Sequence, residues 1–227
     1  LDGRERCSML NSDRMTAASH DRWSSHDDTR TEDHFVHLHG VSWEDYERIV
    51  AIRGDRSAPR ISFVDGELEI MSPSNNHELI ANHIARLVEV WCLEHDVEFN
   101  AVGSWTIGEK RKKRAAEPDE CYVFGPMAGR KVPDLAIEVV WTWGGIDKLE
   151  IYRKLGVREV WFWEKGVITP YRLYGERYRR IASSKALAGI DLERLATFLD
   201  RSSTSKAIRD YRADLRRRRP SGRRNRQ

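Results

Sequence analysis

The sequence predicts an α/β fold, a single domain in which a mixed β-sheet is flanked by helices. Several runs of β-branched and aromatic residues are short and bounded by glycine or proline, which is typical of β-strands. Residues 75–95 instead repeat apolar side chains at helical spacing. A second helical segment, residues 146–156, separates two of the strand-like runs. A helix that crosses over between two strands favours parallel pairing of those strands, so the sheet should contain both orientations.

The segment that organises the chain is a predicted β-hairpin followed by a helix. Its two strand-like runs, residues 121–124 and 132–141, are joined by a turn that contains glycine and proline. If the turn centres near residue 128, Asp119 lies across from roughly Ile137 or Glu138. Cross-strand neighbours are about 5 Å apart. The carboxylates of Asp119 and Glu138 could therefore share one divalent cation.

Asp134 and Lys148 complete this predicted site. Asp134 points to the same face as Glu138 because strand side chains alternate, but four extended residues separate the two by about 13 Å. We therefore expect Asp134 to be a flanking carboxylate rather than a ligand of the same ion. Lys148 lies on the first turn of the helix that ends at Gly156. Its ammonium could fold back over the carboxylate pair and orient a water or neutralise charge on a phosphate.

The residues before the hairpin predict a helix, a second hairpin and a longer helix. Ser42 begins a capping pattern for a helix over residues 41–52, and two strands over residues 60–71 turn at Asp65-Gly66. Glu67 and Glu69 alternate with apolar residues on the second of these strands, which is typical of a solvent-facing edge. The alternative is that Glu67 faces the site. His77 and Glu78 lie in the first turn of the helix over residues 75–95, where the helix dipole alone would explain the glutamate.

The rest of the chain predicts further strands and one more helix. Residues 99–107 form a predicted strand, followed by a basic run beside Asp119. Such a run is either a solvated loop or a contact for a phosphodiester substrate. Strands are expected over residues 158–163, 167–174 and 178–181, and a final helix over residues 187–199. The basic run comprises Lys110, Arg111, Lys112, Lys113 and Arg114.

Composition divides the chain into a leader, a domain and a tail. Residues 1–33 are polar and lack the apolar core of a signal peptide, which predicts a disordered leader before the domain at 34–200. Residues 201–227 are arginine-rich and are expected to be a disordered tail that adds salt-sensitive affinity for nucleic acid. No apolar run approaches the length of a membrane span. Cys7, Cys92 and Cys121 have no metal-binding or disulfide spacing, which favours reduced thiols and a cytoplasmic protein.

Several motifs together resemble one known family. They are Glu117-Pro118-Asp119, the Pro133-Asp134-Leu-Ala-Ile-Glu138-Val segment, Asp147-Lys148 with Tyr152, and the Leu155-to-Trp161 segment that begins Leu-Gly-Val-Arg-Glu. The upstream Val64-to-Pro73 segment and His77 agree with them, so the resemblance covers about residues 40 to 200 in a consistent order. These residues resemble the Uma-two family of restriction-endonuclease-like proteins, within the PD-(D/E)XK nuclease superfamily.

The resemblance implies a restriction-endonuclease-like fold and a metal-dependent nuclease site. In the superfamily, the aspartate of the PD element and the acidic residue of the next strand bind magnesium, and a lysine assists. Carried over, these residues are Asp119, Glu138 and Lys148. The superfamily pattern places the lysine two positions after the acidic residue, where this chain has Val140. A first-helix acidic residue often contributes in the superfamily, which gives His77 or Glu78 a supporting role.

The sequence thus predicts a cytoplasmic endonuclease that uses Mg²⁺, or Mn²⁺, to hydrolyse phosphodiester bonds of double-stranded DNA. Oxygen ligands alone favour such hard cations over zinc. A homodimer would suit double-strand cleavage, by analogy alone. Two alternatives remain at this point. One is a catalytically silent nucleic-acid-binding domain on the same fold, and the other is an interaction protein whose carboxylates only form salt bridges.

Overall fold

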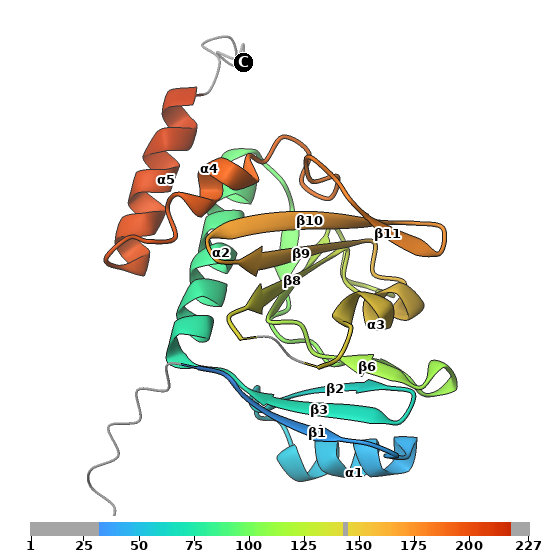
Figure 1. The fold of residues 1–227 in the computed structure, drawn as a ribbon. Coiled ribbons are helices and arrows are strands. Elements are labelled where there is room, and N and C mark those ends of the chain that lie inside the picture. The colour runs from blue at the N-terminus through green and yellow to red at the C-terminus, as the bar shows by residue number, and fades with distance from the viewer. Residues whose placement is uncertain (1–31, 143–144, 219–227) are drawn as a thin grey trace, which may run out of the picture.

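A computed structural model describes residues 32–142 and 145–218, and it contains two β-sheets with helices packed around them (Figure 1). The predicted α/β class with flanking helices is therefore confirmed, but the strands divide between two sheets instead of forming one. Within the described ranges, no helix combines the length and apolar character that crossing a membrane requires.

The first sheet is antiparallel throughout and carries helix α1 (Trp43–Arg53) on one face. As predicted, Ser42 caps this helix, forming a capping box with Asp45. The predicted hairpin turns at Asp65 and Gly66, whose φ angles of 47° and 95° suit a tight two-residue turn. The strand order is β1 (His34–Leu38), β3 (Glu67–Ser72), β2 (Arg60–Val64), β6 (Arg114–Ala116) and β5 (Ile107–Glu109).

The second sheet is mixed. Its strand order is β11 (Arg177–Arg180), β10 (Val167–Tyr174), β9 (Glu159–Glu164), β8 (Leu135–Val140), β7 (Glu120–Phe124) and β4 (Phe99–Ala101). Strands β8 and β9 pair in parallel through helix α3 (Lys148–Leu155), which confirms the predicted crossover. The helix ends at Gly156, whose φ of 86° is in the left-handed region that favours glycine. The β7–β8 hairpin is confirmed as well, with Glu120 paired to Ile137.

Helix α2 (Asn75–Glu94) packs against the second sheet and forms the largest apolar cluster with it. Ser74 caps its start by accepting a hydrogen bond from the backbone of His77. Helix α5 (Thr204–Arg218) lies along the outer side of α2, and the short helix α4 (Leu192–Ala196) lies near both (Figure 1). The apolar stripe predicted over residues 75–95 therefore serves two partners, the sheet and the C-terminal helices.

Two predicted elements differ from the structure because glycines interrupt them. The strand expected over residues 99–107 is divided into β4 and β5, which belong to different sheets, and Gly103 between them has a φ of 63°. The final helix expected over residues 187–199 is helical only as α4. Gly189 has a φ of 96°, and the helix begins after its N-cap, Asp191.

The predicted chain ends also need correction. Residues 201–227 were expected to be disordered, but α5 is a regular helix that buries Ala207, Tyr211 and Asp214. Asp33, assigned to the leader, is buried, and β1 begins directly after it. The remainder of the leader and of the tail, residues 1–31 and 219–227, lies outside the described residues, as does Cys7. Cys92 and Cys121 are buried free thiols, as predicted.

Candidate active site

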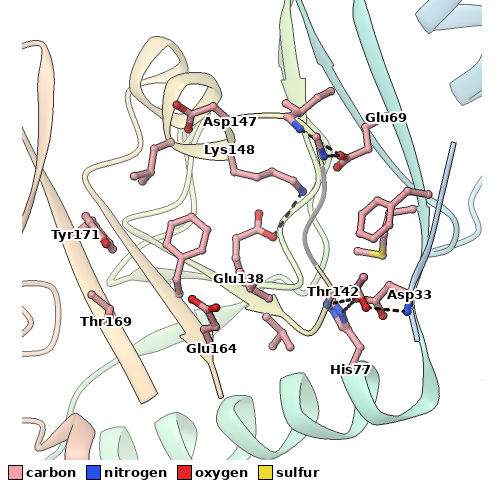
Figure 2. A pocket seen from close by; sticks show the side chains of 18 residues that line it. Asp33, Glu69, His77, Glu138, Thr142, Asp147, Lys148, Glu164, Thr169 and Tyr171 are labelled. Atoms are coloured by element: carbon pink, nitrogen blue, oxygen red, sulfur yellow. Dashed lines mark hydrogen bonds and ion pairs between the residues drawn. The ribbon is translucent and has the colours of Figure 1, made fainter. Parts of the chain in front are cut away.

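A cavity of about 500 Å³ lies where the two sheets and α3 meet. Strands β1 and β3 of the first sheet line one side of it, and strands β8, β9 and β10 of the second sheet line the other. Figure 2 shows Glu138 and Lys148 at its centre, with Tyr171 on one side and Glu69 on the other. The cavity therefore contains two of the three residues that the sequence predicted to be catalytic.

Asp119 and Glu138 lie on adjacent strands, as the hairpin register predicted. Because Glu120 pairs with Ile137, the preceding residue Asp119 lies beside Glu138. The backbone N–H of Val139 donates a hydrogen bond to Asp119 Oδ2 at 2.6 Å, which fixes the carboxylate against β8. Both carboxylates are almost completely buried. Their separation is therefore set by the sheet rather than by flexible side chains.

The second oxygen of Asp119 faces two positively charged groups. Asp119 Oδ1 lies 3.1 Å from Arg60 Nε and 2.9 Å from His77 Nε2. Neither contact has hydrogen-bond geometry, so Oδ1 has no hydrogen-bond partner among the described residues. Burial would raise the pKa of this carboxyl group, but Arg60 and His77 outweigh burial and hold the pKa well below its usual range. Asp119 is therefore ionised at neutral pH.

His77 connects Asp119 to Asp33. Its Nδ1 lies 3.0 Å from Asp33 Oδ2, and Asp33 also accepts hydrogen bonds from the backbone of Ser74 at 2.8 Å and of Thr142 at 3.3 Å. Burial would lower the pKa of His77, but the carboxylates of Asp119 and Asp33 raise it to about 9. The imidazole is therefore an imidazolium that hydrogen-bonds Asp33 through Nδ1 and forms an ion pair with Asp119 through Nε2.

Glu138 has one oxygen held by the protein and one that faces the lysine. The hydroxyl of Tyr152 donates to Oε1, while Lys148 Nζ lies 3.5 Å from Oε2. Burial raises the pKa of Glu138, and the neighbouring Asp119 adds to that rise, although Lys148 opposes it. Burial would lower the pKa of Lys148, but Glu138, Asp119 and Glu69 raise it above its usual value. Lys148 therefore carries its charge at neutral pH.

The donor set fits a hard divalent cation. Asp119 Oδ1 is a buried oxygen to which no described residue donates a hydrogen bond, although Arg60 and His77 lie within ion-pair distance of it. Glu138 lies beside Asp119 on the next strand. The described residues contain no group of three or more histidine, cysteine, aspartate or glutamate side chains placed to hold a metal. Two carboxylates, with water or phosphate as the remaining ligands, are typical of magnesium rather than of zinc.

Comparison with known proteins identifies the family of the chain. Residues 43–199 match the model of the Uma2 family, which is described as "Putative restriction endonuclease". The chain belongs to the Uma2 family. This confirms the resemblance drawn from the sequence motifs. No curated protein matches the chain.

Among solved structures, one match is "a putative nuclease belonging to DUF820" from Anabaena variabilis ATCC 29413. It aligns with a TM-score of 0.42 and 12% sequence identity, over 76% of this chain and 99% of that chain.

Two further residues of this Uma2 protein enter the site, although neither was predicted to have a role in it. Asp33 was assigned to the leader, and Glu69 was interpreted as solvent-facing. Glu69 is only 2% exposed, and its Oε2 accepts hydrogen bonds from the backbone of Gly145 at 2.9 Å and of Ile146 at 3.3 Å. It thereby fixes the chain just before α3, which carries Lys148. The alternation along β3 could have predicted the position of Glu69. Leu68 packs toward α1, whereas Met71, on the same face as Glu69, lines the cavity.

Three residues predicted to support the site lie at its edge or away from it. Glu78 pairs with Arg60 Nη1 at 2.8 Å, so it reaches Asp119 only through that guanidinium. Glu67 is exposed at the start of β3 and pairs with His39. Asp134 lies at the turn end of the β7–β8 hairpin, where it accepts a hydrogen bond from the Phe124 backbone at 3.0 Å. Glu67 and Asp134 do not line the cavity.

The basic run at 110–114 does not line the cavity either. Three of its charges are paired within the protein. Lys110 lies 3.0 Å from Glu44, Lys112 lies 2.8 Å from Glu109, and Arg114 pairs with Asp65. Arg111 and Lys113 form no ion pair with a described residue. Three of the five charges of this run are thus paired with carboxylates away from Asp119.

Proposed function

We propose that this Uma2 protein is a nuclease that hydrolyses phosphodiester bonds of DNA with the help of Mg²⁺ or Mn²⁺. One observation carries the proposal. The Lys148 ammonium lies 3.5 Å from Glu138 inside a cavity, and Asp119 is adjacent on the neighbouring strand. Two carboxylates and a lysine at one cavity are the residue types that metal-assisted phosphodiester hydrolysis requires.

Asp119 and Glu138 would hold the metal. When bound, a magnesium ion supplies a lowered pKa for its water and neutralises charge on the scissile phosphate. Arg60 and His77 keep Asp119 ionised, and Tyr152 orients Glu138 through its hydroxyl. Lys148 lines the cavity beside Glu138, so its ammonium would orient the attacking water or the phosphate oxygen.

Lys148 supplies the ammonium group that the superfamily pattern would place at position 140. Val140 occupies the position where the superfamily has its lysine, and it too lines the cavity. Lys148 reaches Glu138 from the first turn of α3. A relocated lysine therefore supports an active site rather than a silent one.

Incubation of the full chain with plasmid and oligonucleotide DNA in Mg²⁺ or Mn²⁺ tests the proposal. Wild type should cleave only with metal, and Lys148→Met should not cleave. Asp134→Asn is the matched control, because Asp134 is a carboxylate on the same hairpin that does not line the cavity, and it should retain wild-type cleavage. DNA binding that ignores Mg²⁺, without cleavage by the wild type, would contradict the proposal and favour a silent binding domain.

A further inference from the structure

One wall of the cavity is aromatic. Phe162 on β9 and Tyr171 on β10 both line it, with ring centroids 5.8 Å apart and the rings edge to face. Both side chains are only partly buried, and Phe35 on β1 lines the opposite side. Partly buried rings that border a cavity are available to a planar ligand, whereas rings inside the apolar clusters are not.

The size of the cavity favours a single nucleotide over a base pair. A volume of about 500 Å³ is within the range of small-molecule sites. A base inside a duplex is stacked and paired, so enzymes that act in a pocket use single strands or take the nucleotide out of the duplex. Aromatic side chains bind such exposed bases by stacking, with little dependence on sequence.

The positively charged Arg180 lies next to the aromatic wall on the edge strand β11, although it does not line the cavity itself. Tyr171 pairs directly with Arg180 on β11, and paired residues of antiparallel strands point to the same face. Arg180 is exposed and forms no ion pair with any residue that the structure describes. This distinguishes Arg180 from Lys110, Lys112 and Arg114 of the basic run, whose charges are paired.

We infer that the cavity binds an unpaired nucleotide of a single strand, with its base stacked on Tyr171 and its backbone crossing Arg180. This inference rests on the proposed nuclease function and specifies its substrate. According to this inference, strands β10 and β11 contact the nucleic acid, and the basic run at 110–114 does not. It also assigns the cavity to single-stranded substrate rather than to an intact duplex.

Arg179 provides the matched control for Arg180. It is the neighbouring residue on the same exposed edge strand, and it also forms no ion pair with a described residue. Its partner across the ladder is Arg172, so it points to the opposite face of the sheet. Arginines on β11 could instead serve only to prevent aggregation at an exposed edge strand. In that case Arg179→Ala and Arg180→Ala would have the same effect on nucleic-acid binding.

Fluorescence anisotropy on the full chain tests the inference, in EDTA and with the oligonucleotides checked for integrity afterwards. The probes are a labelled single strand of about 12 nucleotides, as DNA and as RNA, and the same DNA strand in a duplex. The single strands should bind more tightly than the duplex. Tyr171→Ala should weaken single-strand binding by about 5- to 150-fold, whereas Tyr171→Phe should keep it because phenylalanine also stacks.

Salt titrations of the same complexes separate the two arginines. Arg180→Ala should weaken binding and reduce the slope of log K against log salt by about 0.7, the value for one phosphate contact on a single strand. Arg179→Ala should change neither. Equal effects of Arg179→Ala and Arg180→Ala, unchanged single-strand binding by Tyr171→Ala, or a duplex bound as tightly as the single strand would each overturn the inference.

Cleavage assays distinguish this inference from the function on which it rests. If no nucleic acid is cleaved but the binding pattern holds, the proposed nuclease fails and the single-strand site stands. If wild type and Tyr171→Ala cleave duplex DNA at the same rate, the nuclease stands and the single-strand site fails.

Discussion

Replacing His77 with glutamine should remove a pH dependence from the stability of the protein. The imidazole lies between Asp33 and Asp119, at 3.0 Å and 2.9 Å, and these carboxylates raise its pKa from 6.5 to about 9 although burial opposes them. The folded protein therefore binds this proton more tightly than the unfolded chain does. The resulting stability is complete below pH 6.5 and is lost as the pH rises through 9.

The size of the effect follows from the two pKa values. A rise from 6.5 to about 9 corresponds to about 3 kcal/mol of unfolding free energy, at about 1.4 kcal/mol per pH unit. About 2 kcal/mol of this should be lost between pH 7 and pH 9. Burial also raises the pKa of Glu120 to about 7. This buried glutamate therefore destabilises the fold as the pH rises toward 7, and most of that loss is complete by pH 7. The interval above pH 7 therefore reports on His77.

Urea unfolding in metal-free buffer, followed by the fluorescence of the eight tryptophans, measures this difference. Between pH 7 and pH 9, wild type should lose about 2 kcal/mol more than His77→Gln. His34→Gln, which alters an exposed histidine on β1, should follow the wild type. Parallel curves for wild type and His77→Gln would refute a charged imidazole between two buried carboxylates.

Three further predictions concern the surroundings of the site and the C-terminal helix. Glu94→Gln should loosen α5 by about 1 kcal/mol, seen as faster amide exchange, because two α5 arginines bind this carboxylate and lower its pKa to about 2. In the wild type this contribution should be lost as the pH falls from 4.5 toward 2, and protection factors of α5, corrected for the intrinsic exchange rate, that do not change over this interval would contradict it. The hydrogen bond from Tyr152 lowers the pKa of Glu138, so Tyr152→Phe should raise that pKa and move the acidic limb of the cleavage rate profile to higher pH. An unmoved limb would count against this role. Asp119→Asn should reduce the cleavage rate by about 100-fold or more, and a rate within a few-fold of wild type would show that Asp119 is not needed.

The part of the site that the sequence predicts is the part encoded by local patterns. Asp119 and Glu138 are joined by a hairpin whose turn contains glycine, so strand geometry alone places them side by side. Lys148 follows on a helix with a clear end at Gly156, and that helix must cross back over the sheet to reach β9. The three residues predicted to be catalytic all lie within residues 119–148.

The part that sequence reasoning missed depends on contacts between distant segments. Asp33 lies in a polar stretch typical of disorder, yet its partners are Ser74, His77 and Thr142. Glu69 alternates with apolar residues as a surface strand would. Its face is covered because the chain before α3 lies against it and His37 lies beside its carboxylate. Period-two alternation identifies two faces of a strand, but it does not distinguish solvent from a buried polar site.

The same distinction applies to the charged segments. Arginine-rich residues after 201 have the composition of a disordered tail, but Tyr211 lies at helical spacing from Ala207 and both are buried against the rest of the protein. The basic run near 110 has the composition of a nucleic-acid contact, but Lys110 meets Glu44 on α1. In both cases the partner lies far away in sequence, where composition carries no information about it.

Magnesium binding measured by titration calorimetry tests the central claim most directly. The full chain should bind Mg²⁺, and Glu138→Gln should not, because it removes one of the two proposed ligands. Glu67→Gln changes an exposed glutamate at the start of β3 and should bind as the wild type does. If wild type binds no Mg²⁺ with or without DNA, or if Glu138→Gln binds it unchanged, the carboxylate pair is not a metal site and the proposed chemistry is wrong.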